Sequence, residues 1–282
     1  MDRQDHDQAK EPDHHDLGHS LQTLLNTGRD YQKAKDHGYS VLLMDGQLDT
    51  ALVGLLEQKL SDNGKEHVRF SRVDSDTVSR LIPKKEDAQE VLDADESANL
   101  SSAFKSQMPA LEKSEFHVEV QPMGADEQPA VITQSEYMRR MKEMSKLQAG
   151  MSFYGEMPDM YSFILNSDHP VVSKINAELK EQTAEALKPI EAELKGLRAR
   201  QAALRDEQNK EKDKFPEEQK KDLEQTDADI KAQEDRKNDV LANFAKSEDK
   251  VHHLIDLALL QNGMLRGEAL DSFVKRSIEL IK

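Results

Sequence analysis

The strongest constraint on the fold comes from residues 173–247, a highly charged stretch with a thin apolar seam. Apolar residues, with a few polar ones among them, recur every three or four positions in two separate runs. Pro216 separates the runs because proline breaks a helix, and the acidic residues after it suit the first turn of a second helix. The stretch therefore predicts an antiparallel helical hairpin over residues 175–247, a coiled coil with solvated, charged flanks. The expected seam residues are Ile190, Leu194, Leu197, Gln201, Leu204, Leu223, Thr226, Ile230, Gln233, Lys237, Val240 and Phe244.

The segment from residue 250 to the C-terminus holds the most apolar helices of the chain. Between residues 254 and 260, Asp256 is the one polar residue, and a second amphipathic helix follows a break at Asn262-Gly263 and Gly267. A helix that is apolar nearly all round must be buried on most sides, and so polar a chain offers little cover. Two such helix pairs joined as a four-helix bundle would bury both helices, which predicts a homodimer. The residues expected at the dimer interface are Leu254, Leu257, Leu260, Leu270, Phe273, Val274 and Ile278.

Composition excludes several classes of function. The 282 residues carry a formal net charge of -16, which argues against a nucleic-acid partner because phosphates require a basic surface. There is no cysteine, so disulfides, thiolate catalysis and cysteine zinc sites are excluded. Apolar runs fall short of membrane-spanning length, and the N-terminus lacks the apolar region of a signal peptide. We therefore expect a soluble, cytoplasmic protein with no membrane partner.

The N-terminal third divides into three parts by composition. Residues 1–37 are polar and rich in histidine, which is more typical of a disordered leader or an expression remnant than of a loose metal site. Residues 38–83 predict a small α/β piece: a strand at 41–44, a helix with leucines on one face capped by Asp45 or Asp49, and a strand at 68–73. Residues 84–98 are charged and weakly apolar, and we expect a linker there.

Residues 99–172 predict a small α+β region, which makes the whole chain a predominantly helical α+β protein. A short helix near residue 100 precedes a strand at 116–123 and a partner strand at 130–134. The segment 135–163 then concentrates six of the eleven methionines. Such flexible, unbranched side chains serve either a core or an adaptable binding surface.

Long runs of sequence resemble the C-terminal part of a known family. SQMPALEKSEF, ITQSEYMRRMKEMSKLQAGMSFYGEMPD, LNSDHPVV and LIDLALLQNGMLRGEALDSFVKRSIELI are similar to the bacterial ninety-kilodalton heat-shock chaperones, in the form found in Bacteroidetes. The likeness covers about residues 38–174 and 250–281. The hairpin at 175–247 looks like an insertion that many members of the family lack.

The resemblance implies a domain arrangement and a function. Residues 38–83 would be the end of the family's middle domain, and residues 99–282 its C-terminal dimerisation domain with the inserted hairpin. The intact family binds ATP and Mg²⁺ through an N-terminal domain that has no counterpart here, so the resemblance implies neither a cofactor nor enzymatic activity for this chain. The implied partners are a second copy of the chain and unfolded client proteins.

The same resemblance assigns a role to part of the methionine-rich segment. In the family an amphipathic helix of the C-terminal domain contacts unfolded clients, and its counterpart here has four basic residues interleaved with the apolar ones, which suit acidic parts of a client. The expected client-binding residues are Tyr137, Met138, Met141, Met144 and Leu147. The alternative for the segment is core packing, which we favour for Met151, Phe153, Tyr154, Met157, Met160 and Tyr161 because they lie next to predicted strands.

Two other functions are compatible with parts of the sequence. A structural adaptor would use the coiled-coil hairpin to recruit a partner. A hydrolase or metal enzyme would need a catalytic or metal-binding motif, and the sequence has neither an HExxH motif nor a paired-carboxylate or Ser/His/Asp pattern. We therefore expect a client-binding chaperone, with the adaptor as the alternative.

Overall fold

The computed structural model describes residues 49–62, 70, 92–147, 157–210 and 216–281. These residues form a predominantly helical α+β fold, as the sequence predicts. The expected leader and the strand at 41–44 lie outside the described residues, and so does the strand at 68–73 except for Phe70. The elements are α2 (Asp49–Asp62), α4 (Ala94–Lys105), β1 (Ser114–Gln121), β2 (Ala130–Gln134), α5 (Glu136–Leu147), β3 (Asp159–Asn166), α7 (Pro170–Lys210), α8 (Glu217–Ser247), α9 (Asp249–Gln261) and α10 (Gly267–Ile281).

The first helix after the expected linker begins earlier than the apolar pattern suggests. Asp93 caps α4, and its carboxylate accepts a hydrogen bond from the backbone N–H of Glu96 at 2.7 Å. An Asp followed three residues later by Glu is a typical helix start, and here it lies inside the charged segment expected to be a linker. Residues 94–98 therefore belong to a helix.

The sheet has three strands in the order β1-β3-β2. β3 pairs in parallel with β1 and antiparallel with β2. We expected β2 to be the partner of β1, and this expectation is wrong because β3 lies between them. The sequence of β3 does not alternate between apolar and polar residues, because its second half, Phe163 to Asn166, is buried on both faces. Burial on both faces is usual for a central strand.

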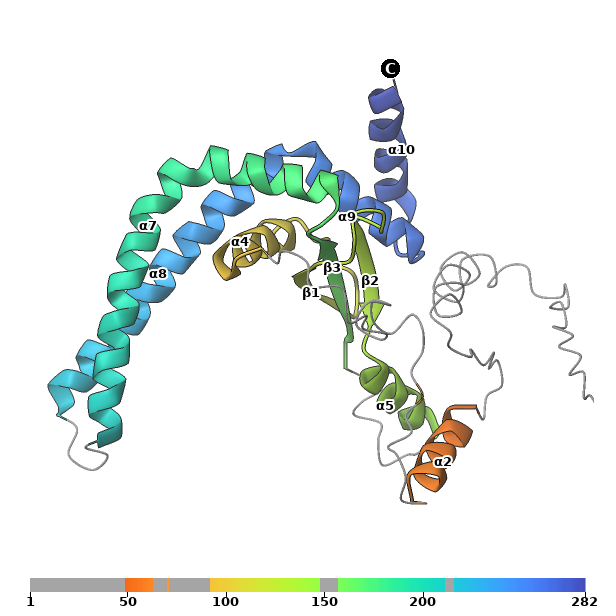
Figure 1. Ribbon diagram of the computed structural model, residues 1–282, viewed down its shortest axis with the longest axis horizontal. Helices are drawn as coiled ribbons and strands as arrows, with labels where there is room; N and C mark the ends of the chain where they lie inside the picture. The colour runs from red at the N-terminus through yellow and green to blue at the C-terminus, as the bar shows by residue number, and fades with distance from the viewer. Residues whose placement is uncertain (1–48, 63–69, 71–91, 148–156, 211–215, 282) are drawn as a thin grey trace, which may run out of the picture.

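A single apolar core joins the sheet to the helices around it. Phe104 of α4 and Phe163 of β3 are fully buried, and their ring centroids lie 6.1 Å apart. Val172 and Ile175 of α7 and Leu241 of α8 belong to the same cluster, so the base of the hairpin is part of the core. In Figure 1 the sheet lies below this base, with α4 beside it.

A buried asparagine organises the turn from β3 into α7. The Asn166 amide nitrogen donates to the carbonyl oxygens of Gly124 and Gln128 at 2.8 and 3.1 Å, while its oxygen accepts from the N–H of Met123 at 3.0 Å. Asp168 accepts from the N–H of Gly124 at 2.8 Å. These bonds hold the β1–β2 loop against the start of α7.

The predicted hairpin is confirmed as α7 and α8. Of the expected seam residues, Leu194, Leu204, Thr226, Ile230, Gln233 and Phe244 are buried, and the others are half-buried. Ion pairs bridge the two helices on the outside, such as Arg198 with Glu234 at 2.9 Å and Lys237 with Glu191 at 3.1 Å. Figure 1 shows the hairpin arching away from the sheet. Pro189 lies within α7, where it removes one backbone hydrogen bond and favours this curvature.

The two C-terminal helices differ in how they are covered. The apolar helix α9 is buried as expected, but the chain itself supplies the cover: Leu254 is 4% and Leu259 1% exposed within the core cluster. The expectation that so polar a chain offers little cover for both helices is therefore wrong for α9. It holds in part for α10, where Val274 and Ile278 are 45% and 51% exposed.

A glycine-dependent turn separates these helices. Gly263 has a φ of 65°, and the N–H groups of Gly263 and Met264 donate to the carbonyl oxygens of Leu260 and Leu259 at 3.0 and 2.8 Å. This pair of bonds is a Schellman motif, which ends α9 and explains the break predicted at Asn262-Gly263. Within the described ranges, no helix has the length and apolar character that crossing a membrane requires.

Candidate functional site

The helix predicted to contact clients is present as α5. Tyr137 in the first turn of α5 is 61% exposed, whereas Ser145 is buried two turns later, so exposure changes along the helix rather than between opposite sides. Met138 and Met141 are half-buried and share the side of Ser145, since their spacing of three and four residues follows the helical repeat. The side chains of Met144 and Leu147 lie outside the described part of the chain.

The apolar residues after α5 divide between core and surface. Tyr161 on β3 packs against the core and stacks on its β1 partner Phe116, with ring centroids 5.6 Å apart. The core interpretation is wrong for Met160, which is 38% exposed because it lies near the start of β3, before the covered half of the strand. Met157 is half-buried. The other expected core residues, Met151, Phe153 and Tyr154, lie outside the described ranges.

Basic residues of α5 are engaged within the chain. Lys142 forms an ion pair with Asp159 of β3 at 2.6 Å, and Gln134 donates to the same carboxylate at 3.2 Å. Arg140 forms an ion pair with Glu57 of α2 at 2.9 Å. These two cations therefore hold α5 in place, and the idea that they attract acidic client segments loses support.

The predicted dimerisation residues separate into a buried and an exposed group. On α9, Leu254 belongs to the apolar core of the chain. On α10, Phe273 is 8% exposed and its ring lies 5.1 Å from that of His253. Val274 and Ile278 face solvent one helical turn apart, so they form an apolar stripe on the outer side of α10. The half-buried members of the group are Leu257, Leu260 and Leu270.

An ion pair fixes α10 against α9. Arg276 donates a hydrogen bond to the carboxylate of Asp256, the polar residue of the apolar helix. Burial raises the pKa of Asp256, while the positive charge and the hydrogen bond of Arg276 work in the opposite direction. The nearby His252 and His253 also lower this pKa when charged. The Arg276–Asp256 pair thus joins α10 to α9, with Val274 and Ile278 left exposed.

Replacing Arg276 by Met should make the stability of the chain more sensitive to pH. Without the cation, the pKa of Asp256 in the folded state rises further above its unfolded value of about 3.9. The folded variant then binds the proton of Asp256 more tightly than the unfolded chain does. The variant is therefore only slightly less stable than the parent near pH 4, and this deficit in stability grows as the pH rises. Thermal unfolding of the parent and R276M from pH 4 to 8 measures this. The double variant D256N/R276M should show no growing deficit, and a deficit of R276M that is constant with pH contradicts the assignment.

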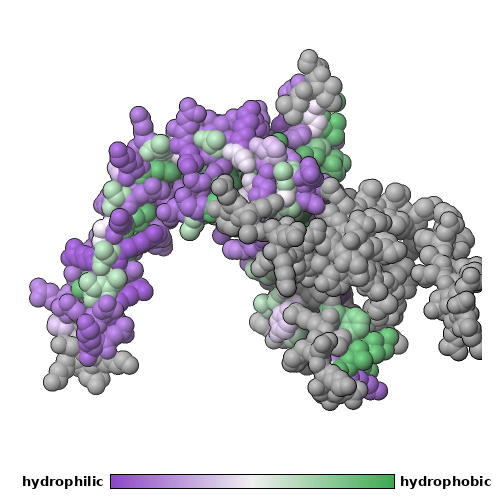
Figure 2. Space-filling view, in the orientation of Figure 1, coloured by the Kyte–Doolittle hydropathy of each residue, from purple (hydrophilic) through white to green (hydrophobic). Residues whose placement is uncertain are grey.

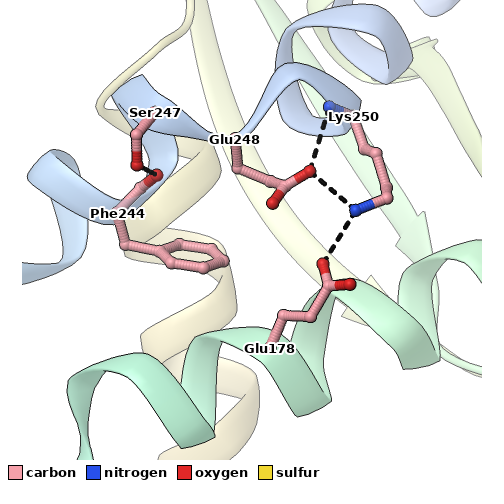
Figure 3. A network of polar contacts seen from close by, with 5 residues as sticks. All are labelled: Glu178, Phe244, Ser247, Glu248 and Lys250. Atoms are coloured by element: carbon pink, nitrogen blue, oxygen red, sulfur yellow. Dashed lines mark hydrogen bonds and ion pairs between the residues drawn. The ribbon is translucent and has the colours of Figure 1, made fainter.

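A three-residue network joins the hairpin to α9. Figure 3 shows the Lys250 ammonium between Glu178 of α7 and Glu248, the residue that caps α9, at 2.9 and 2.8 Å. Its hydrogen bonds to Glu248 and Glu178 raise the pKa of Lys250, and the same bond to Lys250 lowers the pKa of Glu178. The network links α7 to the start of α9 through side-chain contacts. Among the described residues, no group of three or more His, Asp or Glu side chains is placed to hold a metal ion.

Comparison with known proteins gives a consistent result. The chain is 51% identical over 252 residues to chaperone protein HtpG of Bacteroides fragilis, 46% over 251 residues to HtpG of Bacteroides thetaiotaomicron and 42% over 251 residues to HtpG of Porphyromonas gingivalis. The chain is homologous to part of HtpG. Each match covers 89% of this chain but 36% of the relative, as expected for a C-terminal portion of HtpG. No family model and no solved structure matches the chain.

The length of the HtpG matches also bears on the inserted hairpin. The alignment to HtpG of Bacteroides fragilis covers 252 of the 282 residues of this chain. The residues outside 175–247 are too few to make up this length, so the HtpG relatives share at least part of the hairpin.

The ion pairs of α5, α9 and α10 were not foreseen from the sequence. Their partners lie 17 to 83 residues apart, and no local pattern relates positions so distant.

Proposed function

We propose that this chain is the client-binding and self-associating part of a chaperone of the HtpG type, with no catalytic activity of its own. The observation that carries the proposal is the 51% identity to an HtpG chaperone over 89% of the chain. Exposed Tyr137 with half-buried Met138 and Met141 on α5, and exposed Val274 and Ile278 on α10, support the division of roles. In this division α5 contacts the client and α10 contacts a second copy of the chain.

Methionine on a surface helix suits contact with many different clients. Its unbranched thioether side chain can repack against differently shaped apolar segments at little cost in strain. Tyr137 adds an exposed aromatic ring. Its hydroxyl group can face water when no client is bound, and its ring can pack against the apolar side chains of a bound client. The ion pairs of Arg140 and Lys142 keep the helix in position while its apolar residues adapt.

Self-association through α10 would present two α5 helices to one client. Each α5 offers a small apolar surface, and the affinity of one such surface for an unfolded segment is low. Two surfaces held in one dimer bind a long client more tightly because the second contact is intramolecular. Self-association therefore strengthens client binding without adding any new contact to either α5.

Replacing Met138 and Met141 together by Ser should reduce the ability of the chain to suppress aggregation by several-fold. The hydroxyl side chains cannot form the apolar contacts that hold an unfolded segment. The assay is light scattering of thermally unfolded citrate synthase at increasing ratios of chaperone chain. Met160→Ser is the matched control, since it removes a partly exposed methionine from the sheet.

The control, Met160→Ser, should suppress aggregation to the same extent as the parent. Equal suppression by M138S/M141S and the parent contradicts the assignment of α5. No suppression by the parent itself contradicts the proposed function as a whole. Far-UV circular dichroism verifies that both variants keep the helix content of the parent.

The coiled-coil adaptor has weaker support. The outer faces of α7 and α8 carry charges of both signs that pair across the hairpin, such as Arg198 with Glu234 and Arg200 with Asp222. Paired charges on a two-helix coiled coil are typical of a solvated surface rather than of a face selected to bind one partner.

A further inference from the structure

A bidentate ion pair connects α2 to α5. The two terminal guanidinium nitrogens of Arg140 donate to the two carboxylate oxygens of Glu57 at 2.9 and 3.3 Å. Both side chains are 21% exposed. Because the geometry is bidentate and partly shielded from water, this pair fixes direction as well as distance, unlike a single exposed contact.

The backbone of Phe70 completes the connection. Its N–H donates to Glu57 at 2.7 Å, and its carbonyl oxygen accepts from Arg140 at 2.8 Å. The same two side chains that bind one another therefore also bind both polar groups of one residue. Three segments of the chain meet at this point, and replacing either charged side chain removes the ion pair together with one of the two bonds to Phe70.

The pair joins parts of the chain that are far apart in sequence. Glu57 and Arg140 are separated by 83 residues, with the expected linker at 84–98 between them. Figure 1 shows α2 next to α5 on the side of the sheet away from α10. At the other side of α5, Lys142 is paired with Asp159 of β3. The contacts thus run from α2 through α5 to the sheet.

Apolar packing contributes little to the position of α2. Val53 is the buried apolar residue of this helix, at 7% exposure, and Leu56 is half-buried. The other leucines, Leu52, Leu55 and Leu60, are 46%, 56% and 45% exposed. Figure 2 shows the hydrophobic surface that these leucines form over α2. A helix with so little buried apolar area depends on its polar contacts for a defined direction.

We propose that Arg140 and Glu57 form a latch that holds α2 in one direction relative to the sheet, and that opening the latch lets α2 swing. The latch couples the segment before the expected linker to the helix after it. This inference does not rest on the proposed function, because it concerns the relative position of two helices and not what either helix binds.

Distances between spin labels test the latch directly. The chain has no cysteine, so Gln58→Cys on α2 and His117→Cys on β1 give two unique, exposed labelling sites. Double electron–electron resonance then reports the distribution of distances between α2 and the sheet. Dilution with excess unlabelled chain removes distances between protomers. The measurement is made on the parent and on the variants Glu57→Gln, Arg140→Met and the two combined.

The parent should give one narrow distribution, and each single variant should broaden it, about doubling its width as α2 swings. The combined variant should be no broader than either single variant, since both break the same pair. Lys59→Met, which removes an exposed charge from the same helix, should leave the distribution unchanged. A narrow, unshifted distribution in both single variants overturns the proposal, and so does an equal broadening in Lys59→Met.

Discussion

Replacing Phe163 by Ala is expected to lower the free energy of unfolding by about 3–5 kcal/mol, the usual cost of removing a buried Phe. Phe163 is fully buried in the central strand of the sheet and stacks on Phe104 at 6.1 Å. The substitution leaves a cavity between the sheet and α4 that rigid neighbours cannot close. Urea unfolding followed by far-UV circular dichroism measures the change. Because domains of this kind are stable by only about 5–15 kcal/mol, the loss is a large fraction of the total.

Tyr137→Ala is the matched control for this experiment. It removes an aromatic ring of similar size, but one that is 61% exposed, so we expect a change within about 0.5 kcal/mol. A loss below about 1 kcal/mol for Phe163→Ala would place Phe163 outside a packed core and contradict the arrangement of α4 on the sheet.

Replacing both Val274 and Ile278 by Asp is expected to weaken self-association by about a hundredfold or more. The two residues form the exposed stripe of α10, at 45% and 51% exposure, where a second copy would pack. Burying an unpaired polar group costs about 1–3 kcal/mol, and each 1.4 kcal/mol is a factor of ten in the association constant. Size-exclusion chromatography with light scattering measures the change at fixed concentration. Because both side chains are exposed in the protomer, the variant should fold as well as the parent.

Ser272→Asp is the matched control on α10. It adds the same type of charge to the same helix, at an exposed position away from the stripe. We expect Ser272→Asp to keep the mass of the parent. If V274D/I278D also keeps that mass, the α10 stripe is not the interface. If Ser272→Asp dissociates the protein as well, the effect is one of overall charge rather than of the stripe.

The helical part of the fold was predictable because its signal is local. A seam residue such as Ile230 or Phe244 recurs with the helical period, and Pro216 and Gly263 end helices through their own backbone chemistry. The same local pattern of apolar residues predicted the helices α5 and α10. An amphipathic pattern specifies the apolar side of a helix but not what covers it, so of the residues named on these helices Tyr137, Val274 and Ile278 are exposed and Phe273 is buried.

The remaining features depend on contacts that no local pattern encodes. β3 was missed because a strand buried on both faces has no alternation, and its pairing between β1 and β2 is set by tertiary packing. Leu254 was expected at a dimer interface but lies in the core, because burial alone does not reveal which molecule provides the cover. The partners of Arg140 and Arg276 depend on which helices meet, and this follows from the whole fold.

The central claim, that this chain associates with itself as part of a chaperone, is tested most directly by its mass in solution. Sedimentation equilibrium over a hundredfold range of concentration should give a dimer of twice 32.0 kDa that dissociates only at the lowest concentrations. A folded monomer at every concentration would contradict the account, since the exposed stripe of α10 would then have no second copy to cover it.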